Sequence, residues 1–219
     1  MIGTIRRIGL IAAAGLLLPA CGKDFKSGTT LFAERFNGTF PGTSWTTPVT
    51  TGAAPTVAID GTTGNPAPAL KMSTATATGT AKTESTLAFN NPNLSISVHM
   101  AAQSAGTTEV GTATVSILDS TPAVVATASW DNTTNLITFH INGGSADQTV
   151  VVTADSTFQR VLFNVSSAGT ATWTFNNGGA LVSRPGFTPG LLKVELSSTF
   201  GAGTAWPSFF FDFVNVTSP

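Results

Sequence analysis

The sequence predicts an all-β protein, built as an antiparallel sandwich of about a dozen strands. Short runs in which every second residue is apolar recur along the chain, and residues 94–100 are the clearest of them. Gly, Asn, Pro and Asp separate these runs at intervals of about 8–12 residues, which is typical of sandwiches and barrels. Beyond residue 30 no segment has the 3.6-residue period of an amphipathic helix.

The first half of the chain is expected to form strands with one apolar face each. The opening strand places Phe32, Glu34 and Phe36 on one face, and a loop with Pro41 and Gly42 follows it. In the clearest strand Leu94, Ile96, Val98 and Met100 face inward, while Ser95, Ser97 and His99 face outward. The expected strands are residues 31–36, 56–59, 70–72, 84–89, 94–100 and 113–117.

The second half repeats this pattern between turns such as residues 142–144 and 176–179. Ile137, Phe139 and Ile141 share a face in one run, and the last run is the most aromatic, with four Phe between residues 209 and 213. The expected strands are residues 124–130, 135–141, 149–153, 158–165, 171–175, 192–196 and 208–216.

The N-terminal segment has the layout of a secretory signal. Arg6 and Arg7 precede an apolar run over residues 8–18, which is too short to span a membrane because a spanning helix needs about 20 residues. Residues 18–21, Leu-Pro-Ala-Cys, resemble the lipobox of bacterial lipoproteins. The resemblance implies cleavage before Cys21 and acylation of Cys21; the alternative is a plain thiol beside an ordinary cleavage site.

The resemblance to lipoproteins divides the chain into a signal peptide (1–20), a lipidated tether (21–29) and a folded domain (30–219). It implies an exported protein that the lipid holds in a membrane, at the outer membrane or the cell surface. Acyl chains contribute about 0.8 kcal/mol per buried methylene, so two or more of them anchor a protein stably.

Composition excludes several classes of function. Charged residues make up 10% of the chain, against about 25% in an average protein. Ten Lys and Arg include Arg6 and Arg7, so the exported part carries eight basic and eleven acidic residues, a net charge of −3. With no basic stripe, nucleic acid is not an expected partner.

A single cysteine allows no intrachain disulfide. Nothing in the sequence points to an oligomer, so a monomer is expected.

Three segments resemble the concanavalin-A-like lectin/glucanase jelly rolls and the related carbohydrate-binding-module sandwiches. They are residues 32–45, with the pattern Phe-x-Glu-x-Phe followed by a Gly/Pro loop and Trp; residues 69–72; and residues 211–216 near the end of the chain. The resemblance covers about residues 30–217 and implies a jelly-roll sandwich for the whole exported domain.

The same resemblance implies a structural calcium ion. In these sandwiches an acid of the first strand and an Asp of the last strand share the ion, and Glu34 and Asp212 occupy those positions. Calcium takes six to eight oxygen ligands, with loop carbonyls completing the set. The alternative is that Glu34 pairs with Arg35 or another neighbour and that Asp212 is an ordinary strand acid.

Two of the four tryptophans are candidates for sugar binding. Sugar rings stack on exposed aromatic side chains, while nearby amides and carboxylates bind the hydroxyls. Trp130 precedes Asp131 and Asn132, and Trp173 lies close to Asn176 and Asn177; His99 is a further candidate on an outward strand position. The alternative for the tryptophans is burial, the usual position of large aromatic residues.

Catalytic chemistry finds little support in the sequence. A glycosidase needs two carboxylates about 5–5.5 or 6.5–9.5 Å apart, yet the acids closest in sequence are Asp147 and Asp155, and only a cross-strand pair such as Glu84 with Glu109 could serve. The Tyr of jelly-roll lyases is missing, and two histidines with one cysteine are too few for zinc.

The sequence therefore favours a non-catalytic envelope lipoprotein that binds carbohydrate or another surface polymer. A structural or adhesive protein without a sugar site is the first alternative, and a glycoside hydrolase is the second and disfavoured one.

Overall fold

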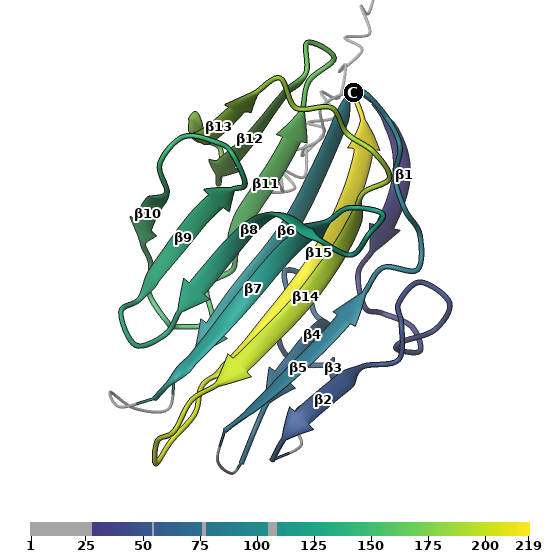
Figure 1. The fold of residues 1–219 in the computed structure, drawn as a ribbon. Coiled ribbons are helices and arrows are strands. Elements are labelled where there is room, and N and C mark those ends of the chain that lie inside the picture. The colour runs from purple at the N-terminus through teal and green to yellow at the C-terminus, as the bar shows by residue number, and fades with distance from the viewer. Residues whose placement is uncertain (1–27, 54, 76–77, 105–108) are drawn as a thin grey trace, which may run out of the picture.

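The protein is a two-layer β-sandwich, seen here in a computed structural model that describes residues 28–53, 55–75, 78–104 and 109–219. Figure 1 shows the two layers stacked face to face, with the strands of both layers aligned along roughly the same axis. The described residues form fifteen strands and no helix, so the predicted all-β sandwich is confirmed. Among these residues none belongs to a helix long and apolar enough to cross a membrane.

One sheet has eight strands in the order β13-β12-β11-β6-β15-β4-β3, with β1 also paired to β15. Every pair in it is antiparallel. Its strands are β1 (Thr29–Glu34), β3 (Thr56–Asp60), β4 (Ala69–Ser73), β6 (Leu94–Gln103), β11 (Gln159–Val165), β12 (Thr170–Phe175), β13 (Ala180–Pro185) and β15 (Ser208–Ser218).

The other sheet has seven strands in the order β10-β9-β8-β7-β14-β5-β2, again antiparallel throughout. Its strands are β2 (Val49–Gly52), β5 (Gly79–Glu84), β7 (Gly111–Leu118), β8 (Val124–Asp131), β9 (Leu136–Ile141), β10 (Gln148–Val151) and β14 (Lys193–Phe200).

The last strand, β15, has two different neighbours along one edge. Its first part pairs with β4 through Phe209–Phe211, and its second part pairs with β1 from Val214 onward. A register irregularity between Asp212 and Asn215 separates the two parts, and Phe213 there has a φ of 48°. Such a bulge shifts the alternation of side chains by one position, so Phe211 and Val214 both face the core.

The core lies between the sheets and contains the apolar residues that alternate in the sequence. Leu94, Ile96, Val98 and Met100 are each at most 1% exposed, as their pattern predicts. Their outward neighbours Ser95 and Ser97 are also largely covered, because Asn164 and Arg160 of the adjacent β11 form hydrogen bonds with them.

The predicted set of strands needs three corrections. The strand expected at residues 84–89 is instead β5, which ends at Glu84, and the residues after it form a turn with isolated bridges. β2 and β13 were not predicted. The inward positions of β5 are Gly79, Ala81 and Thr83, and all four residues of β2 are exposed, so neither strand carries a large apolar alternation.

Candidate functional site

The outward side of the seven-stranded sheet carries rows of hydroxyl side chains, which we call the hydroxyl face. Most inward positions of its central strands are buried apolar residues, and most positions between them are Ser, Thr or ionisable residues. Residues opposite each other on neighbouring strands point to the same side, so the register aligns these side chains. The central row is Lys82, Ser197, Thr114, Ser129, Thr138 and Thr149.

Hydroxyl groups in the central row lie at regular intervals. Neighbouring strands are about 4.7–4.9 Å apart, so the five hydroxyl residues from Ser197 to Thr149 extend over roughly 19 Å. The hydroxyls of Thr114 and Ser129 are within hydrogen-bond distance of each other, at 2.9 Å. A parallel row on one side is Glu84, Glu195, Ser116, Thr127 and His140, and one on the other is Thr51, Thr80, Thr199, Thr112 and Asp131.

A carboxylate pair with a lysine between the two acids lies at one end of this face. Glu84 and Glu195 are opposite each other on β5 and β14. Lys82 Nζ is 2.9 Å from Glu195 Oε2 and 3.5 Å from Glu84 Oε1. The hydrogen bond to Glu195, with the charges of both acids, raises the pKa of Lys82. The suggested pair of Glu84 with Glu109 is wrong, because Glu195 is the ladder partner of Glu84 and Glu109 is buried, 2% exposed.

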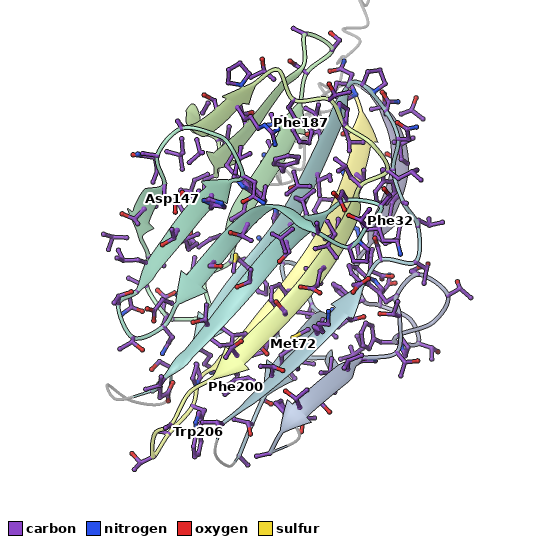
Figure 2. The ribbon with its side chains drawn as sticks, viewed as in Figure 1. Phe32, Met72, Asp147, Phe187, Phe200 and Trp206 are labelled. Atoms are coloured by element: carbon purple, nitrogen blue, oxygen red, sulfur yellow. The ribbon has the colours of Figure 1, made fainter. Side chains whose placement is uncertain are left out.

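A histidine with two oxygen partners lies at the other end of the face. His140 Nδ1 is 2.7 Å from Asp147 Oδ1, and Nε2 is 2.8 Å from Asn142 Oδ1. The Asn142 amide nitrogen donates to the Val124 carbonyl, which turns its oxygen toward the ring. The bonds to Asp147 and Asn142 raise the pKa of His140. Figure 2 shows Asp147 beside β9.

The charge of His140 is expected to make stability depend on pH. The pKa of His140 in the folded state is raised above its ordinary value of 6.5. The charged histidine therefore stabilises the folded state fully at pH values below the pKa of the unfolded state. This stabilisation is lost as the pH rises through the pKa of the folded state. The pair is partly exposed, at 41% and 51% for the two side chains, so we expect about 0.2–1 kcal/mol. Urea unfolding of Asp147→Asn should show a larger loss against wild type at pH 5.5 than at pH 8.5, and equal losses would contradict this role.

The tryptophans expected to bind sugar are in the core, so that prediction is wrong. Trp130 is 0% and Trp173 is 1% exposed. Both occupy inward positions of their strands, and the Trp173 ring centroid is 5.2 Å from that of Phe163 and 6.0 Å from that of Phe139. A buried ring has no free face on which a sugar can stack.

The two asparagines expected beside those tryptophans lie in the turns that follow β8 and β12. Asn132 is 6% exposed, and its backbone N–H donates to the Gly111 carbonyl at 3.0 Å. The Asn176 side chain accepts from the Arg160 N–H at 3.0 Å and donates to Gln159 Oε1 at 3.2 Å. His99 lies on the outward side of the eight-stranded sheet, opposite Asp212, with its ring centroid 5.4 Å from that of Phe213. The structure therefore does not bring these five predicted residues together on one surface.

The two acids expected to share calcium lie on adjoining strands and bind local backbone groups. Asp212 is 1% exposed, with Oδ2 accepting from Asn65 N at 2.7 Å and Oδ1 from Phe213 N at 2.6 Å. Burial nevertheless raises the pKa of Asp212. Glu34 is opposite Val214, and its Oε1 accepts from Phe36 N at 2.6 Å. No three His, Cys, Asp or Glu side chains of the described residues form a metal-binding group, so this arrangement does not fit a carboxylate-rich site, and the calcium ion stays a prediction.

A shared calcium ion is expected to raise the melting temperature, because a ligand of the native state stabilises it. Thermal melting in calcium and in chelator measures this directly, with Glu34→Gln as the variant that should remove the shift. An unchanged melting temperature in both conditions would contradict the prediction.

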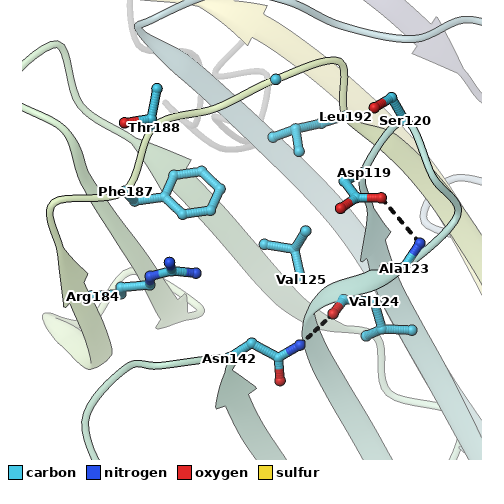
Figure 3. Close-up of a pocket in the computed structure, with 11 residues that line it drawn as sticks. Asp119, Ser120, Ala123, Val124, Val125, Asn142, Arg184, Phe187, Thr188 and Leu192 are labelled. Carbon is cyan, nitrogen blue, oxygen red and sulfur yellow. Dashed lines mark hydrogen bonds between the residues drawn. The ribbon is translucent and has the colours of Figure 1, made fainter.

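A cavity of about 350 Å³ opens at one end of the sandwich, between three loops (Figure 3). Its two charged side chains, Asp119 and Arg184, have partners within their own segments of the chain. Asp119 Oδ1 accepts from Thr121 N at 2.8 Å and Ala123 N at 3.0 Å. The pKa of Asp119 is lowered by its hydrogen bonds, above all by the one from the Thr121 hydroxyl. The Arg184 guanidinium lies 5.3 Å from the Phe187 ring centroid. The cavity lies between loops and aligns no row of polar side chains, so the hydroxyl face is the better candidate site.

Comparison with solved structures identifies the fold. A β-1,3-glucanase from Mycobacterium marinum matches 87% of this chain and 100% of its own, with a TM-score of 0.58 and 13% identity. The globular domain of T. cruzi calreticulin matches 87% and 89%, with a TM-score of 0.55 and 11% identity. The exoplasmic/lumenal domain of VIP36, in a Ca2+/Man-bound form, matches 78% and 83%, with a TM-score of 0.52 and 10% identity.

At these low identities the likeness concerns the fold alone. No family model matches the sequence, and no curated protein does. The resemblance first indicated by residues 32–45, 69–72 and 211–216 is confirmed at the level of architecture: the chain has the jelly-roll sandwich fold of the concanavalin-A-like lectins and glucanases.

Proposed function

We propose that this chain is a non-catalytic lipoprotein of a bacterial cell envelope that binds a glycan on its hydroxyl face. The observation that carries the proposal is the central row, in which the register of six strands aligns side chains able to form hydrogen bonds with a sugar. A hydroxyl both donates and accepts, as sugar hydroxyls do. A row that crosses several strands suits an extended polysaccharide better than a single sugar ring.

The composition of the rows predicts modest affinity for each sugar unit. No Phe or Trp stands among their residues, so stacking does not contribute there. Binding would come from hydrogen bonds, each adding about 0.5–1.5 kcal/mol net, and from the charged groups at either end. Affinity should therefore increase with the length of the glycan.

The surroundings of Glu84 and Glu195 support a non-catalytic role. A retaining or inverting glycosidase uses two carboxyl groups that flank the scissile bond. Glu84 and Glu195 instead share the Lys82 ammonium, which bonds to both acids. The outward residues of the central strand β7 are Thr112, Thr114 and Ser116, with no acid among them.

The solved structures with this fold are compatible with a glycan ligand. One is named a β-1,3-glucanase and another was obtained in a Man-bound form. Anchoring through Cys21 rests on the N-terminal pattern, which lies outside the described residues. Mass spectrometry of the mature protein tests it: a diacylated Cys21 at the N-terminus is expected, and an unmodified N-terminus would contradict it.

A structural or adhesive role is the second candidate. The edge strand β2 is exposed at all four residues, and Val151 on the edge strand β10 is 77% exposed. Unprotected edge strands pair readily with other chains. In this alternative the hydroxyl face has no ligand.

A glycan array with the purified protein separates the two functions. Binding to extended polysaccharides, stronger for longer oligomers of the same sugar, is the expected result. A folded protein that binds nothing across a broad panel would contradict glycan binding and favour the structural role.

A further inference from the structure

Exposed apolar side chains gather at one end of the sandwich. Six large hydrophobic residues of the described chain are exposed, and two of them, Val49 and Val151, lie on the edge strands β2 and β10. The other four are Leu31 (38%), Leu87 (50%), Val124 (40%) and Leu191 (46%). A single exposed Leu is ordinary, but a cluster marks an interaction surface. We call these four residues the apolar rim.

Backbone pairing joins two of the loops that carry the rim. Phe89 and Leu192 form a bridge with hydrogen bonds of 2.7 and 2.9 Å, which joins the loop after β5 to the loop before β14. Leu31 and Leu87 line one cavity of about 320 Å³ on one side of the bridge. Val124 and Leu192 line the cavity of about 350 Å³ on its other side, and Leu191 is the residue before Leu192.

The described chain begins at this same end. Thr29, the first residue of β1, is opposite Ser218 near the C-terminus. The Pro219 carbonyl accepts from Asn93 Nδ2 at 3.1 Å, and Asn93 belongs to the loop that carries Leu87. Figure 1 shows the C-terminus and β1 at the upper end, and Figure 2 places Phe187 of the larger cavity toward it.

The tether keeps this end close to the lipid. Cys21 stands eight residues before Thr29, and a fully extended chain gains at most about 3.3–3.6 Å per residue, so the start of β1 lies within roughly 30 Å of the acylated residue.

The two charged residues that line the larger cavity have partners within their own part of the structure. Asp119 accepts hydrogen bonds from Thr121 and Ala123 of its own loop, and Arg184 lies over the Phe187 ring. Contact with lipid would therefore be apolar and largely insensitive to salt, because screening weakens only electrostatic attraction.

We propose that the apolar rim lies against the surface of the lipid bilayer, so that the sandwich stands with this end on the membrane. This inference rests on the lipid anchor of the proposed function. It fixes the orientation of the domain: the strands point away from the bilayer, and the hydroxyl face stays open to the side.

Single-cysteine labelling of the mature, lipidated protein on phosphatidylcholine vesicles tests the proposal. Because Cys21 is the only cysteine and carries the lipid, an introduced cysteine is the only free thiol. Leu87→Cys and Leu191→Cys place an environment-sensitive fluorophore on the rim. Val49→Cys and Val151→Cys, also exposed apolar positions, are the matched controls.

The expected result is a blue shift of emission at positions 87 and 191 when vesicles are added, unchanged in about 1 M salt, with none at positions 49 and 151. Vesicle-bound protein with water-like emission at all four positions would overturn the orientation and leave the anchor intact. Protein that does not float with vesicles would overturn both. Blue-shifted emission at positions 87 and 191 already in the absence of vesicles would show that a second copy of the chain covers the rim. That result would overturn the lipid contact.

Discussion

Replacing Trp173 by alanine is expected to lower the free energy of unfolding by about 3–5 kcal/mol, the usual cost of removing a buried Trp or Phe side chain. The ring packs against Phe163 of its own sheet and Phe139 of the other. Its Nε1 donates to the His140 carbonyl at 2.9 Å, so one side chain joins β12 to β9. Domains of this size are stable by about 5–15 kcal/mol, so the loss is a large part of the total. Urea unfolding measures it.

Trp206→Ala is the control for this prediction. Trp206 is half-buried, and its Nε1 donates to Gly201 O within the loop between β14 and β15. Figure 2 shows Trp206 at the end away from Phe187. We expect a loss nearer that of one hydrogen bond, about 1 kcal/mol. A Trp173→Ala variant that is as stable as wild type but no longer binds glycans would contradict the core position and restore the binding role.

Replacing Thr114 by arginine is expected to weaken glycan binding at least tenfold. Thr114 is in the middle of the central row, and its hydroxyl is bonded to that of Ser129. The substitution removes the Thr114 hydroxyl, and the long, charged arginine side chain covers the neighbouring hydroxyls. A tenfold loss corresponds to about 1.4 kcal/mol, which titration calorimetry with the best glycan of the array resolves.

Thr172→Arg is the matched control for the hydroxyl face. Thr172 is also a half-buried Thr in the middle of a strand, on the outward side of the other sheet. This variant should bind like wild type, and both variants should keep the wild-type circular dichroism and melting temperature. An equal loss in both would place the site elsewhere, and no loss in Thr114→Arg would contradict binding on the hydroxyl face.

Alternation of residue types predicted the long strands well and the short ones badly. β6 and β9 follow their apolar patterns, because the alternate residues that start at Leu94 and at Ile137 are buried in the core. β13 has a single buried residue, Val182, and β5 buries Gly79, Ala81 and Thr83. Such strands form because the neighbouring strands offer unpaired backbone groups for hydrogen bonding. The residues of the strand itself carry no pattern that shows this, so the strand cannot be predicted from them.

Residues of the candidate site were missed for the same reason. His140 and Asp147 are seven residues apart, and only the β9–β10 hairpin brings them to 2.7 Å. Glu84 and Glu195 are far apart in sequence and become neighbours through the pairing of β5 with β14. The outward hydroxyls could have been noticed as Thr-x-Thr-x-Ser in residues 112–116, but their alignment into rows depends on register across the sheet.

Period-two alternation by itself determined the fold class and the inward face of regular long strands such as β6 and β9, because both follow from the geometry of one extended segment. Only the tertiary structure decided which polar side chains meet and which aromatic rings are enclosed. Trp130 and Trp173 stand beside Asp and Asn in sequence, as sugar-binding residues do, yet both occupy inward positions, and the apposition of the two sheets buries them. Register and sheet order join residues far apart in the chain, and no short sequence pattern contains either.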